Sequence, residues 1–272
     1  MSRIVPLHLI LLAGGTGRRA GGSGPGQRPK QFHPTGRGPL FAVSVREFLN
    51  LDPTTGFRLA GVTIAVPDSW QEEATLGLAP VMRANRSCPW QLASAGETRT
   101  GSTWQAIQTL ERGYSAGQDG SPPEAYDLVA VHDAARPFAS VDLLGRLAAA
   151  AGSGADSAKT SAGCAVPGIP VPDTIVQKSS PDFVPSPGGR DSDSFALYLP
   201  RETLLAVQTP QVFRWDIFRA AHAVAAAEGL DFTDDGGLLA SRGHNPVMVP
   251  GETGNWKVTS EADLQRAEEL LK

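Results

Sequence analysis

Short apolar runs alternate with segments of helical periodicity as far as residue 166, and this alternation limits the fold more than any other feature. The apolar runs are residues 4–12, 60–66, 90–93, 127–131 and 164–166, and the helical segments between them are residues 40–51, 68–82, 100–114 and 140–151. Phe41, Val45 and Phe48, for example, recur at helical spacing. Because parallel strands are joined by crossovers that are usually helices, this order predicts an α/β fold with parallel strands.

A glycine-rich turn follows the first apolar run. Residues 11–19 read Leu-Leu-Ala-Gly-Gly-Thr-Gly-Arg-Arg, and Pro29-Lys30-Gln31 follows further along. Glycine lets backbone N–H groups approach phosphate oxygens without interference from a Cβ atom, and Arg19 and Lys30 add positive charge. The sequence therefore predicts a phosphate-binding turn, with a plain surface loop as the alternative.

Two better-known phosphate-binding motifs fit this turn less well. The Gly-Lys-Ser/Thr ending of a nucleoside-triphosphatase P-loop is missing from it. Residues 15–20 differ from the dinucleotide motif G-x-G-x-x-G only in a final alanine, so a dinucleotide fold stays open, although the following Pro-Lys-Gln argues against it.

The fourth apolar run also ends in groups that bind anions or cations. Residues 131–137 read Val-His-Asp-Ala-Ala-Arg-Pro. The ligand crevice of a parallel sheet lies beyond the carboxyl ends of its strands, so Asp133 and Arg136 are expected at the same edge as the glycine turn. The alternative is an Asp–Arg pair that only caps the next turn.

The composition narrows the class of protein. The chain has 272 residues, 41% of them hydrophobic, and a formal net charge of −4, which gives no broad basic surface for nucleic acid. Cys88 and Cys164 lie far apart without histidine pairs nearby, so we expect two buried fillers rather than a zinc site or a disulfide. With neither a targeting segment nor an apolar span in view, we expect a cytoplasmic protein with no nucleic-acid or membrane partner.

The alternation breaks between residues 167 and 209. Residues 171–177 and 195–199 are predicted to form two extended arms, and residues 179–193 between them, rich in Ser, Pro, Gly and Asp, are expected to be a mobile linker. A helix over 215–228, an apolar run at 247–249 and a final helix capped by Ser260 and Asp263 follow. Asp234 and Asp235 suggest either a helix cap, the favoured interpretation, or a second metal site.

Taken in order, these motifs resemble those of one enzyme family. The glycine turn with Pro29-Lys30-Gln31, the segment 132–137, Thr-Pro-Gln at 209–211 and Asn-Trp-Lys-Val-Thr at 255–259 resemble 2-C-methyl-D-erythritol 4-phosphate cytidylyltransferases of the non-mevalonate isoprenoid pathway. Residues 96–102 are similar to the nucleotide-recognition turn of the family, and residues 171–174 to the start of its β-arm. The resemblance covers nearly the whole chain.

The resemblance implies one nucleotidyltransferase domain over residues 1–272, a Rossmann-like, mostly parallel sheet flanked by helices, with a protruding β-arm at 171–209 for dimerisation. It implies that methylerythritol phosphate attacks the α-phosphorus of CTP and expels pyrophosphate, with Mg²⁺ held by Asp133, in a homodimer that exchanges arms. The family positions carried over are Ala13, Gly14, Gly15, Thr16, Gly17, Gly96, Glu97 and Ser102 for CTP, Arg19, Lys30, Arg201 and Lys257 for catalysis, and Arg136, Thr174 and Thr209 for the acceptor.

Several alternatives stay open. The chain departs from the family in an insertion at 21–28, in Gly101 where aspartate is frequent, and in Pro172 where arginine is frequent. A cytidylyltransferase for another polyol phosphate, such as ribitol 5-phosphate, would share most of these motifs. An NAD(P)-binding oxidoreductase and a non-catalytic nucleotide-binding protein are the alternatives from other classes.

Overall fold

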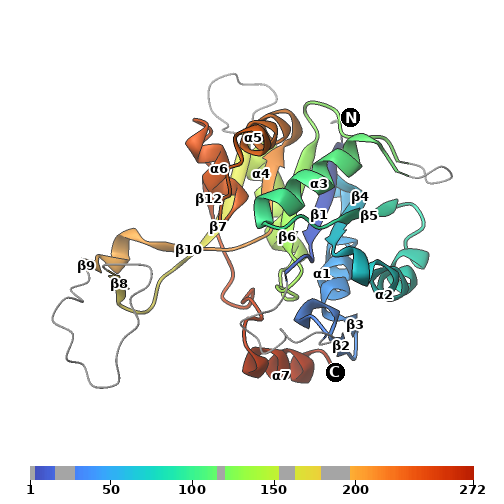
Figure 1. Ribbon diagram of the computed structural model, residues 1–272, viewed down its shortest axis with the longest axis horizontal. Helices are drawn as coiled ribbons and strands as arrows, with labels where there is room; N and C mark the ends of the chain where they lie inside the picture. The colour runs from blue at the N-terminus through green and yellow to red at the C-terminus, as the bar shows by residue number, and fades with distance from the viewer. Residues whose placement is uncertain (1–3, 16–27, 115–119, 153–162, 179–196) are drawn as a thin grey trace.

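The computed structural model describes residues 4–15, 28–114, 120–152, 163–178 and 197–272. An eight-stranded sheet in the order β10-β7-β11-β6-β1-β4-β5, with β12 also paired to β7, forms the centre of the molecule (Figure 1). Its strands are β1 (Val5–Leu12), β4 (Phe57–Val66), β5 (Trp90–Ser94), β6 (Leu128–Asp133), β7 (Cys164–Pro170), β10 (Leu205–Val207), β11 (Gln211–Arg214) and β12 (Val247–Pro250).

The sheet is mostly parallel, which confirms the predicted fold class. Strands β5, β4, β1 and β6 run parallel to one another, and β12 runs parallel to β7. Strand β11 is antiparallel to both β6 and β7, and β10 is antiparallel to β7. The reversal arises because the chain turns back between the end of β7 and the start of β10, and β11 continues in the direction of β10.

Helices cover both faces of the sheet. They are α1 (Leu40–Phe48), α2 (Gln71–Arg83), α3 (Arg99–Glu111), α4 (Val141–Gly152), α5 (Trp215–Glu228) and α6 (Asp235–Ser241). The last helix, α7 (Glu261–Leu270), instead shares a smaller apolar cluster with α1. Short 3-10 turns are η2 (Lys30–Phe32), η3 (Pro53–Thr55), η4 (Asp68–Trp70) and η5 (Arg201–Thr203). Among the helices of the described ranges, none is long and apolar enough to cross a membrane.

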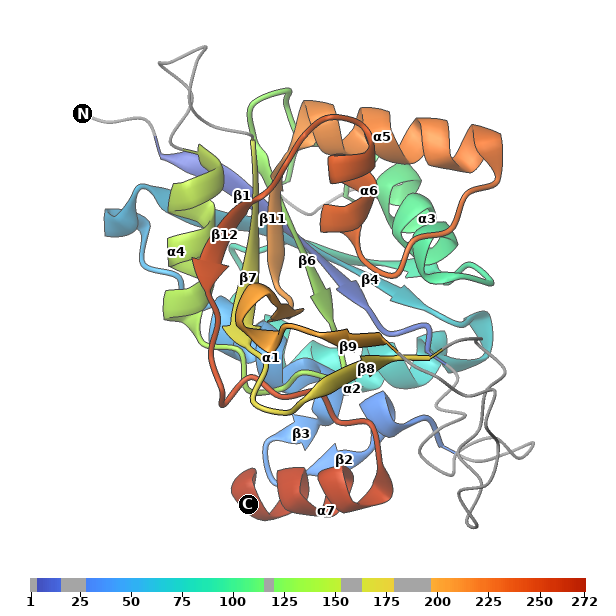
Figure 2. The same cartoon turned by 90° about the vertical axis from the view of Figure 1, so that its left-hand side faces the viewer.

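The two faces of the sheet have separate apolar cores. Helices α1, α2 and α4 pack on one face, and α3, α5 and α6 pack on the other (Figure 2). Leu7, Leu9 and Leu11 of β1 belong to the first core, whereas Ile10 belongs to the second. Burial on both faces explains why the first apolar run is almost continuously aliphatic.

Two of the helix starts that the sequence predicted are confirmed. Ser260 and Asp263 form a reciprocal capping box at α7, and Asp234 accepts a hydrogen bond from the backbone N–H of Gly237 at α6. Asp235 has a different role, because its side chain lies buried against Arg99 and His222.

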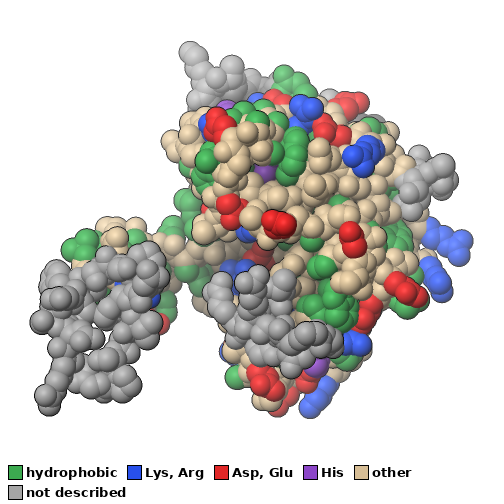
Figure 3. All heavy atoms as spheres, in the orientation of Figure 1, with side chains coloured by type: hydrophobic (Ala, Val, Ile, Leu, Met, Phe, Trp, Pro, Cys, Tyr) green, Lys and Arg blue, Asp and Glu red, His purple; other side chains and the backbone are tan. Residues whose placement is uncertain are grey.

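A hairpin stands away from the body of the molecule. Strands β8 (Ile175–Gln177) and β9 (Leu197–Leu199) pair antiparallel, and they lie apart from the sheet (Figures 1 and 3). Strand β10, the last part of the expected excursion, instead joins the central sheet. The predicted linker 179–193 lies outside the described residues.

Candidate active site

The site is built on the carboxyl ends of the parallel strands. Leu12 at the end of β1 lies in register with Asp133 at the end of β6, and β5 runs parallel to β4 on the other side. The glycine turn, the segment after β5 and Asp133 therefore share one edge of the sheet, as the sequence predicts.

A cavity of about 560 Å³ opens at this edge. The turn after β1, the start of α3, η2 and the end of β6 form its walls, together with Lys257 and Thr259 from the segment before α7. The predicted residues that line it are Gly14, Gly15, Lys30, Gly96, Glu97, Ser102, Asp133 and Lys257. We refer to it as the larger cavity.

Gln31 ties the glycine turn to η2. Its side-chain Nε2 donates to the backbone oxygens of Ala13 at 2.7 Å and of Gly15 at 2.8 Å. Ala13 is itself buried, so it contributes backbone rather than side chain to the turn. These two hydrogen bonds, which we call the Gln31 clamp, fix the distance between the turn and Lys30. The sequence motifs did not assign this role to Gln31. Thr16, Gly17 and Arg19, which the sequence placed in this site, lie outside the described residues.

Two glycines bring backbone segments into close contact around the larger cavity. A Cβ atom on Gly14 would lie 2.7 Å from Cβ of Ala95, and one on Gly96 would lie 2.5 Å from the backbone carbon of Gly101. A side chain at either position would force the turn after β1 or the start of α3 to move. The glycines predicted here therefore keep the backbone of both segments at the cavity wall.

Hydrogen bonds hold the backbone of the segment before α3 in place. Thr98 caps the helix by accepting from the backbone N–H of Gly101 at 3.0 Å. The Ser102 hydroxyl lies 2.8 Å from the carbonyl oxygen of Thr98 and 3.2 Å from that of Gly96, and it can donate to either. These contacts fix the hydrogen-bonding groups that the segment presents to the cavity.

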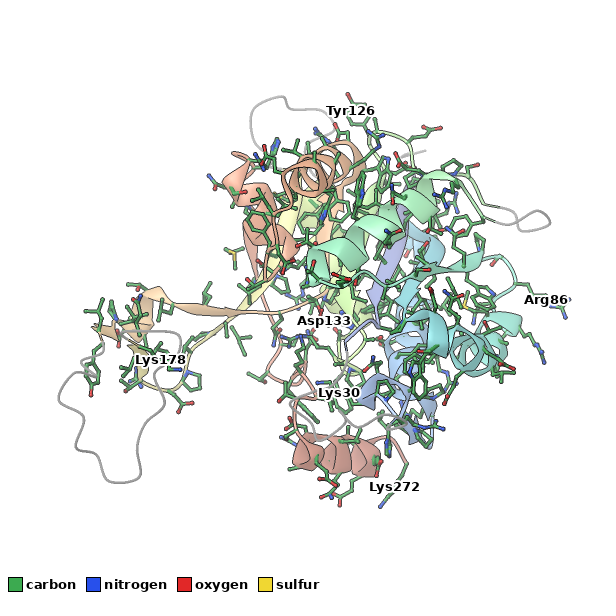
Figure 4. The ribbon with its side chains drawn as sticks, in the orientation of Figure 1. Lys30, Arg86, Tyr126, Asp133, Lys178 and Lys272 are labelled. Atoms are coloured by element: carbon green, nitrogen blue, oxygen red, sulfur yellow. The ribbon has the colours of Figure 1, made fainter. Side chains whose placement is uncertain are left out.

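Asp133 and Lys257 form an ion pair in the wall of the larger cavity (Figure 4, in which Asp133 is labelled). Nζ of Lys257 donates to Oδ2 of Asp133 at 2.6 Å, and Nε of Arg136 lies 3.9 Å from the same oxygen. Burial opposes ionisation of Asp133, but Lys257, Arg99 and Arg136 outweigh it, and the pKa of this carboxyl lies below its ordinary value. The carboxylate is therefore ionised at neutral pH.

His132 holds Thr209 and Arg136 in place behind Asp133. Burial lowers the pKa of His132 to about 4, so the imidazole is neutral at pH 7. Nε2 of this neutral imidazole lies 2.9 Å from the carbonyl oxygen of Arg136, which can only accept, so the ring proton is on Nε2. Nδ1 therefore accepts from the hydroxyl of Thr209 at 3.1 Å, and the oxygen of that hydroxyl accepts from the backbone N–H of Asp133 at 3.0 Å. Sequence motifs gave no role to His132.

A second cavity, of about 320 Å³, adjoins the first. Arg136 and Thr209, both predicted, line it together with Gln208, Gln211, Asp234 and others. Nη1 of Arg136 donates to the carbonyl oxygen of Asn255 at 2.7 Å. Arg99, Asp133 and Lys257 line both cavities, so the two spaces meet at these side chains. We refer to the second space as the smaller cavity.

Two predicted site residues lie elsewhere. Thr174 immediately precedes β8, and Arg201 begins η5, close to the hairpin that projects from the body (Figure 1). Nη1 of Arg201 donates to the carbonyl oxygen of Pro172 at 2.9 Å. Neither residue is among the described residues that line the two cavities.

The donor set at Asp133 fits a magnesium ion that is held mainly by its substrate. In the described ranges, no three His, Cys, Asp or Glu side chains form a cluster that could hold a metal ion by themselves. Mg²⁺ usually binds one or two carboxylates, several waters and the phosphates of a substrate. One ionised carboxylate in the wall of a cavity large enough for a phosphorylated substrate matches that pattern.

Known proteins resemble this chain in sequence and in fold. The family model of 2-C-methyl-D-erythritol 4-phosphate cytidylyltransferase matches residues 7–272. A relative of that name from Deinococcus radiodurans is 32% identical over 235 residues, which are 86% of this chain and 85% of the relative. A protein named bifunctional enzyme IspD/IspF from Rhodopseudomonas palustris is 32% identical over 263 residues, 96% of this chain but 55% of that protein, so the chain spans about half the length of this relative.

Solved structures agree with these matches. The crystal structure of 2-C-methyl-D-erythritol 4-phosphate cytidylyltransferase from Thermus thermophilus superposes with a TM-score of 0.64 at 28% identity, covering 98% of each chain. A structure of the enzyme of that name from Francisella tularensis has a TM-score of 0.68 at 20% identity, which supports the fold alone.

Proposed function

The chain belongs to the 2-C-methyl-D-erythritol 4-phosphate cytidylyltransferase family, and on that premise we propose that it transfers CMP from CTP to methylerythritol phosphate and releases pyrophosphate. The observation that carries the proposal is the pair of cavities that meet at Asp133 and Lys257. A transfer between two phosphorylated substrates needs both anions side by side, with cations where they meet. A polyol phosphate of another kind, such as ribitol 5-phosphate, is the second candidate acceptor.

The larger cavity is suited to CTP. The backbone from Gly14 onward, with Thr16 and Gly17, would hold the triphosphate through N–H groups. Gly96, Glu97 and Ser102 would contact the base and the ribose from the capped start of α3. We expect fixed backbone groups to read the donors and acceptors on the edge of cytosine.

The reaction we propose is an in-line displacement. An oxygen of the acceptor phosphate forms a bond to the α-phosphorus of CTP, while the bond from that phosphorus to the bridging oxygen of pyrophosphate breaks. Such a transfer between anions depends on positioning and charge neutralisation more than on covalent help. Lys30, with Arg19, would stabilise the charge that develops on the α-phosphoryl group, and Lys257 would orient the attacking phosphate.

The smaller cavity is suited to the acceptor. Arg136 would bind its phosphate, and Thr209, whose hydroxyl is fixed by His132 and Asp133, would contact the polyol. Asp133 would hold Mg²⁺ against the phosphates of CTP, and the ion would supply further neutralisation of charge. Since both substrates are phosphorylated metabolites, we place the reaction in the cytoplasm.

We further propose that the enzyme is a homodimer in which each arm completes the site of the other chain. Thr174 and Arg201 lie close to the projecting hairpin rather than at the cavities of their own chain. Several apolar side chains of this region are exposed, Tyr198 at 68% and Leu197 at 57% among them. A two-stranded hairpin with such a surface is marginal alone, so a second copy is its expected partner. Arg201 of one chain would then join Lys257 of the other.

The choice of nucleotide and acceptor tests the proposed function. With Mg²⁺ and methylerythritol phosphate, we expect pyrophosphate release from CTP to exceed release from UTP by about 10²-fold or more, because UTP presents the opposite donor and acceptor at two ring positions. A panel that includes ribitol 5-phosphate ranks the acceptors by kcat/KM. Equal use of CTP and UTP would contradict a cytosine-reading segment at 96–102.

Metal dependence gives a second prediction. Asp133→Asn keeps the shape of the side chain but loses the charge that binds Mg²⁺, so activity is expected to fall by about 10²-fold. Excess chelator is expected to abolish wild-type activity. Asp142→Asn, a charge loss at an exposed position of α4, is the matched control and is expected to behave like the wild type. Full activity in chelator would remove Asp133 from this role.

A further inference from the structure

Arg99 occupies the junction of the two cavities. It lies within residues 96–102, the segment similar to the family's nucleotide-recognition turn, but the resemblance gave it no role of its own. It is the first residue of α3, and it lines both cavities together with Asp133 and Lys257. Its side chain is 22% exposed and therefore remains partly accessible. A guanidinium offers five N–H donors in a planar fork that matches a phosphate group.

The far side of the guanidinium is held by a buried carboxylate. Nη2 of Arg99 lies 2.7 Å from Oδ2 of Asp235, whose side chain is 1% exposed. Nε2 of His222, equally buried in α5, lies 3.1 Å from the other oxygen of Asp235. The anchor thus joins α6 and α5 to the cavity end of α3.

Neighbouring contacts fix the position of the anchor. The backbone N–H of Thr100 donates to Oδ1 of Asp231 at 3.2 Å, and the backbone N–H of Phe232 donates to Oγ1 of Thr100 at 2.8 Å.

Burial opposes ionisation of Asp235, but the positive charge of Arg99 outweighs the effect of burial and holds the pKa of this carboxyl far below its usual range. The ion pair therefore persists at neutral pH.

A purely structural role for this pair is the alternative. The ion pair of Arg219 with Glu111 also links α5 to α3, at the end of α3 away from the cavities. The pair of Arg99 and Asp235 differs because its cation lines both substrate spaces. A cation that lies between two phosphates can bind both of them. A cation that only links two helices needs no such access to the substrates.

We propose that Arg99 binds a substrate phosphate where the two cavities meet, and that Asp235 is a positioning residue that holds the guanidinium there. The inference deepens the proposed transferase function and rests on it. Arg99 would be a further cation beside Lys257 at the place where the acceptor phosphate meets the nucleotide.

Arg99→Gln tests the contact. We expect kcat/KM for pyrophosphate release to fall by about 10²-fold, as for other preorganised electrostatic groups, while thermal unfolding still shows a cooperative transition. Glu111→Gln, which removes the ion pair of Arg219 with Glu111 between α5 and α3, is the control and is expected to keep wild-type kcat/KM. If Arg99→Gln turns over like the control, Arg99 contacts no substrate and the inference is overturned.

A double-mutant cycle tests the role of Asp235. Asp235→Asn is expected to lower kcat/KM by about 10-fold, the size typical of outer-shell partners. The double variant with Arg99→Gln is expected to match Arg99→Gln alone, because Asp235 acts through Arg99. Losses that multiply would show independent roles and would overturn the positioning role.

If Asp235→Asn does not fold, Asp235→Glu, which keeps the charge on a longer side chain, takes its place in the cycle with the same two outcomes.

The wild-type reaction separates the proposed function from the proposed role of Arg99. A wild-type protein with no turnover on any acceptor contradicts the proposed function, whereas an active wild type with an equally active Arg99→Gln contradicts only this inference.

Discussion

Replacing Lys30 with alanine is expected to lower kcat by about 10² or more, while the affinity for CTP changes far less. Lys30 lines the larger cavity from η2, opposite the glycine turn, and the Gln31 clamp fixes that separation. The charge of Lys30 matters most when negative charge develops on the α-phosphoryl group, and interactions that strengthen in the transition state act on kcat rather than on binding.

Steady-state kinetics and direct titration of CTP separate the two effects. Lys272→Ala removes an exposed lysine outside the cavity, and it is expected to retain wild-type kcat (Figure 4). An unchanged kcat for Lys30→Ala would exclude Lys30 from the mechanism. A loss confined to CTP affinity would make it a binding residue only.

Mixing two inactive variants is expected to restore activity if the site is shared between chains. Arg201→Ala and Lys257→Ala are each expected to be inactive as homodimers. In a mixed dimer, the intact Lys257 of one chain faces the intact Arg201 of the other, so one of its two sites is complete. With random pairing about half the dimers are mixed, and roughly a quarter of wild-type activity should return.

The exchange of subunits must be verified independently, for example with two differently tagged chains. Lys257→Ala mixed with Lys30→Ala is the matched control, since both residues line one cavity of a single chain and a mixed dimer has no complete site. Activity that stays at the level of the single variants after verified exchange would show that Arg201 serves its own chain, and would contradict the shared site.

Local patterns predicted most of the secondary structure. The helix expected at 215–228 has those bounds as α5, and the apolar runs up to residue 166 all became strands of the central sheet. Periodicity and caps suffice there because each element buries its own apolar face. No local pattern predicted that β10 and β11 pair antiparallel with β7, because this pairing depends on contacts between distant segments.

The motifs, taken in their order along the chain, predicted part of the site, and long-range packing determined the rest. Asp133 and Lys257 lie 124 residues apart in sequence, and the family resemblance placed both in the site that the structure assembles at one cavity edge. The contact between Arg99 and Asp235 spans 136 residues and exists only because α3, α5 and α6 pack on one face of the sheet. The tautomer of His132 follows from the nearby carbonyl oxygen of Arg136, whereas its contact with the hydroxyl of Thr209, 77 residues further along the chain, exists only in the folded protein.

Transfer of label from CTP tests the central claim most directly. With Mg²⁺, methylerythritol phosphate and CTP labelled at the α-phosphate, we expect the label in a cytidine diphosphate-linked polyol. With CTP labelled at the γ-phosphate, we expect it in pyrophosphate. Label that remains in CTP for every polyol phosphate, or that appears only as CMP or orthophosphate, would contradict a cytidylyltransferase.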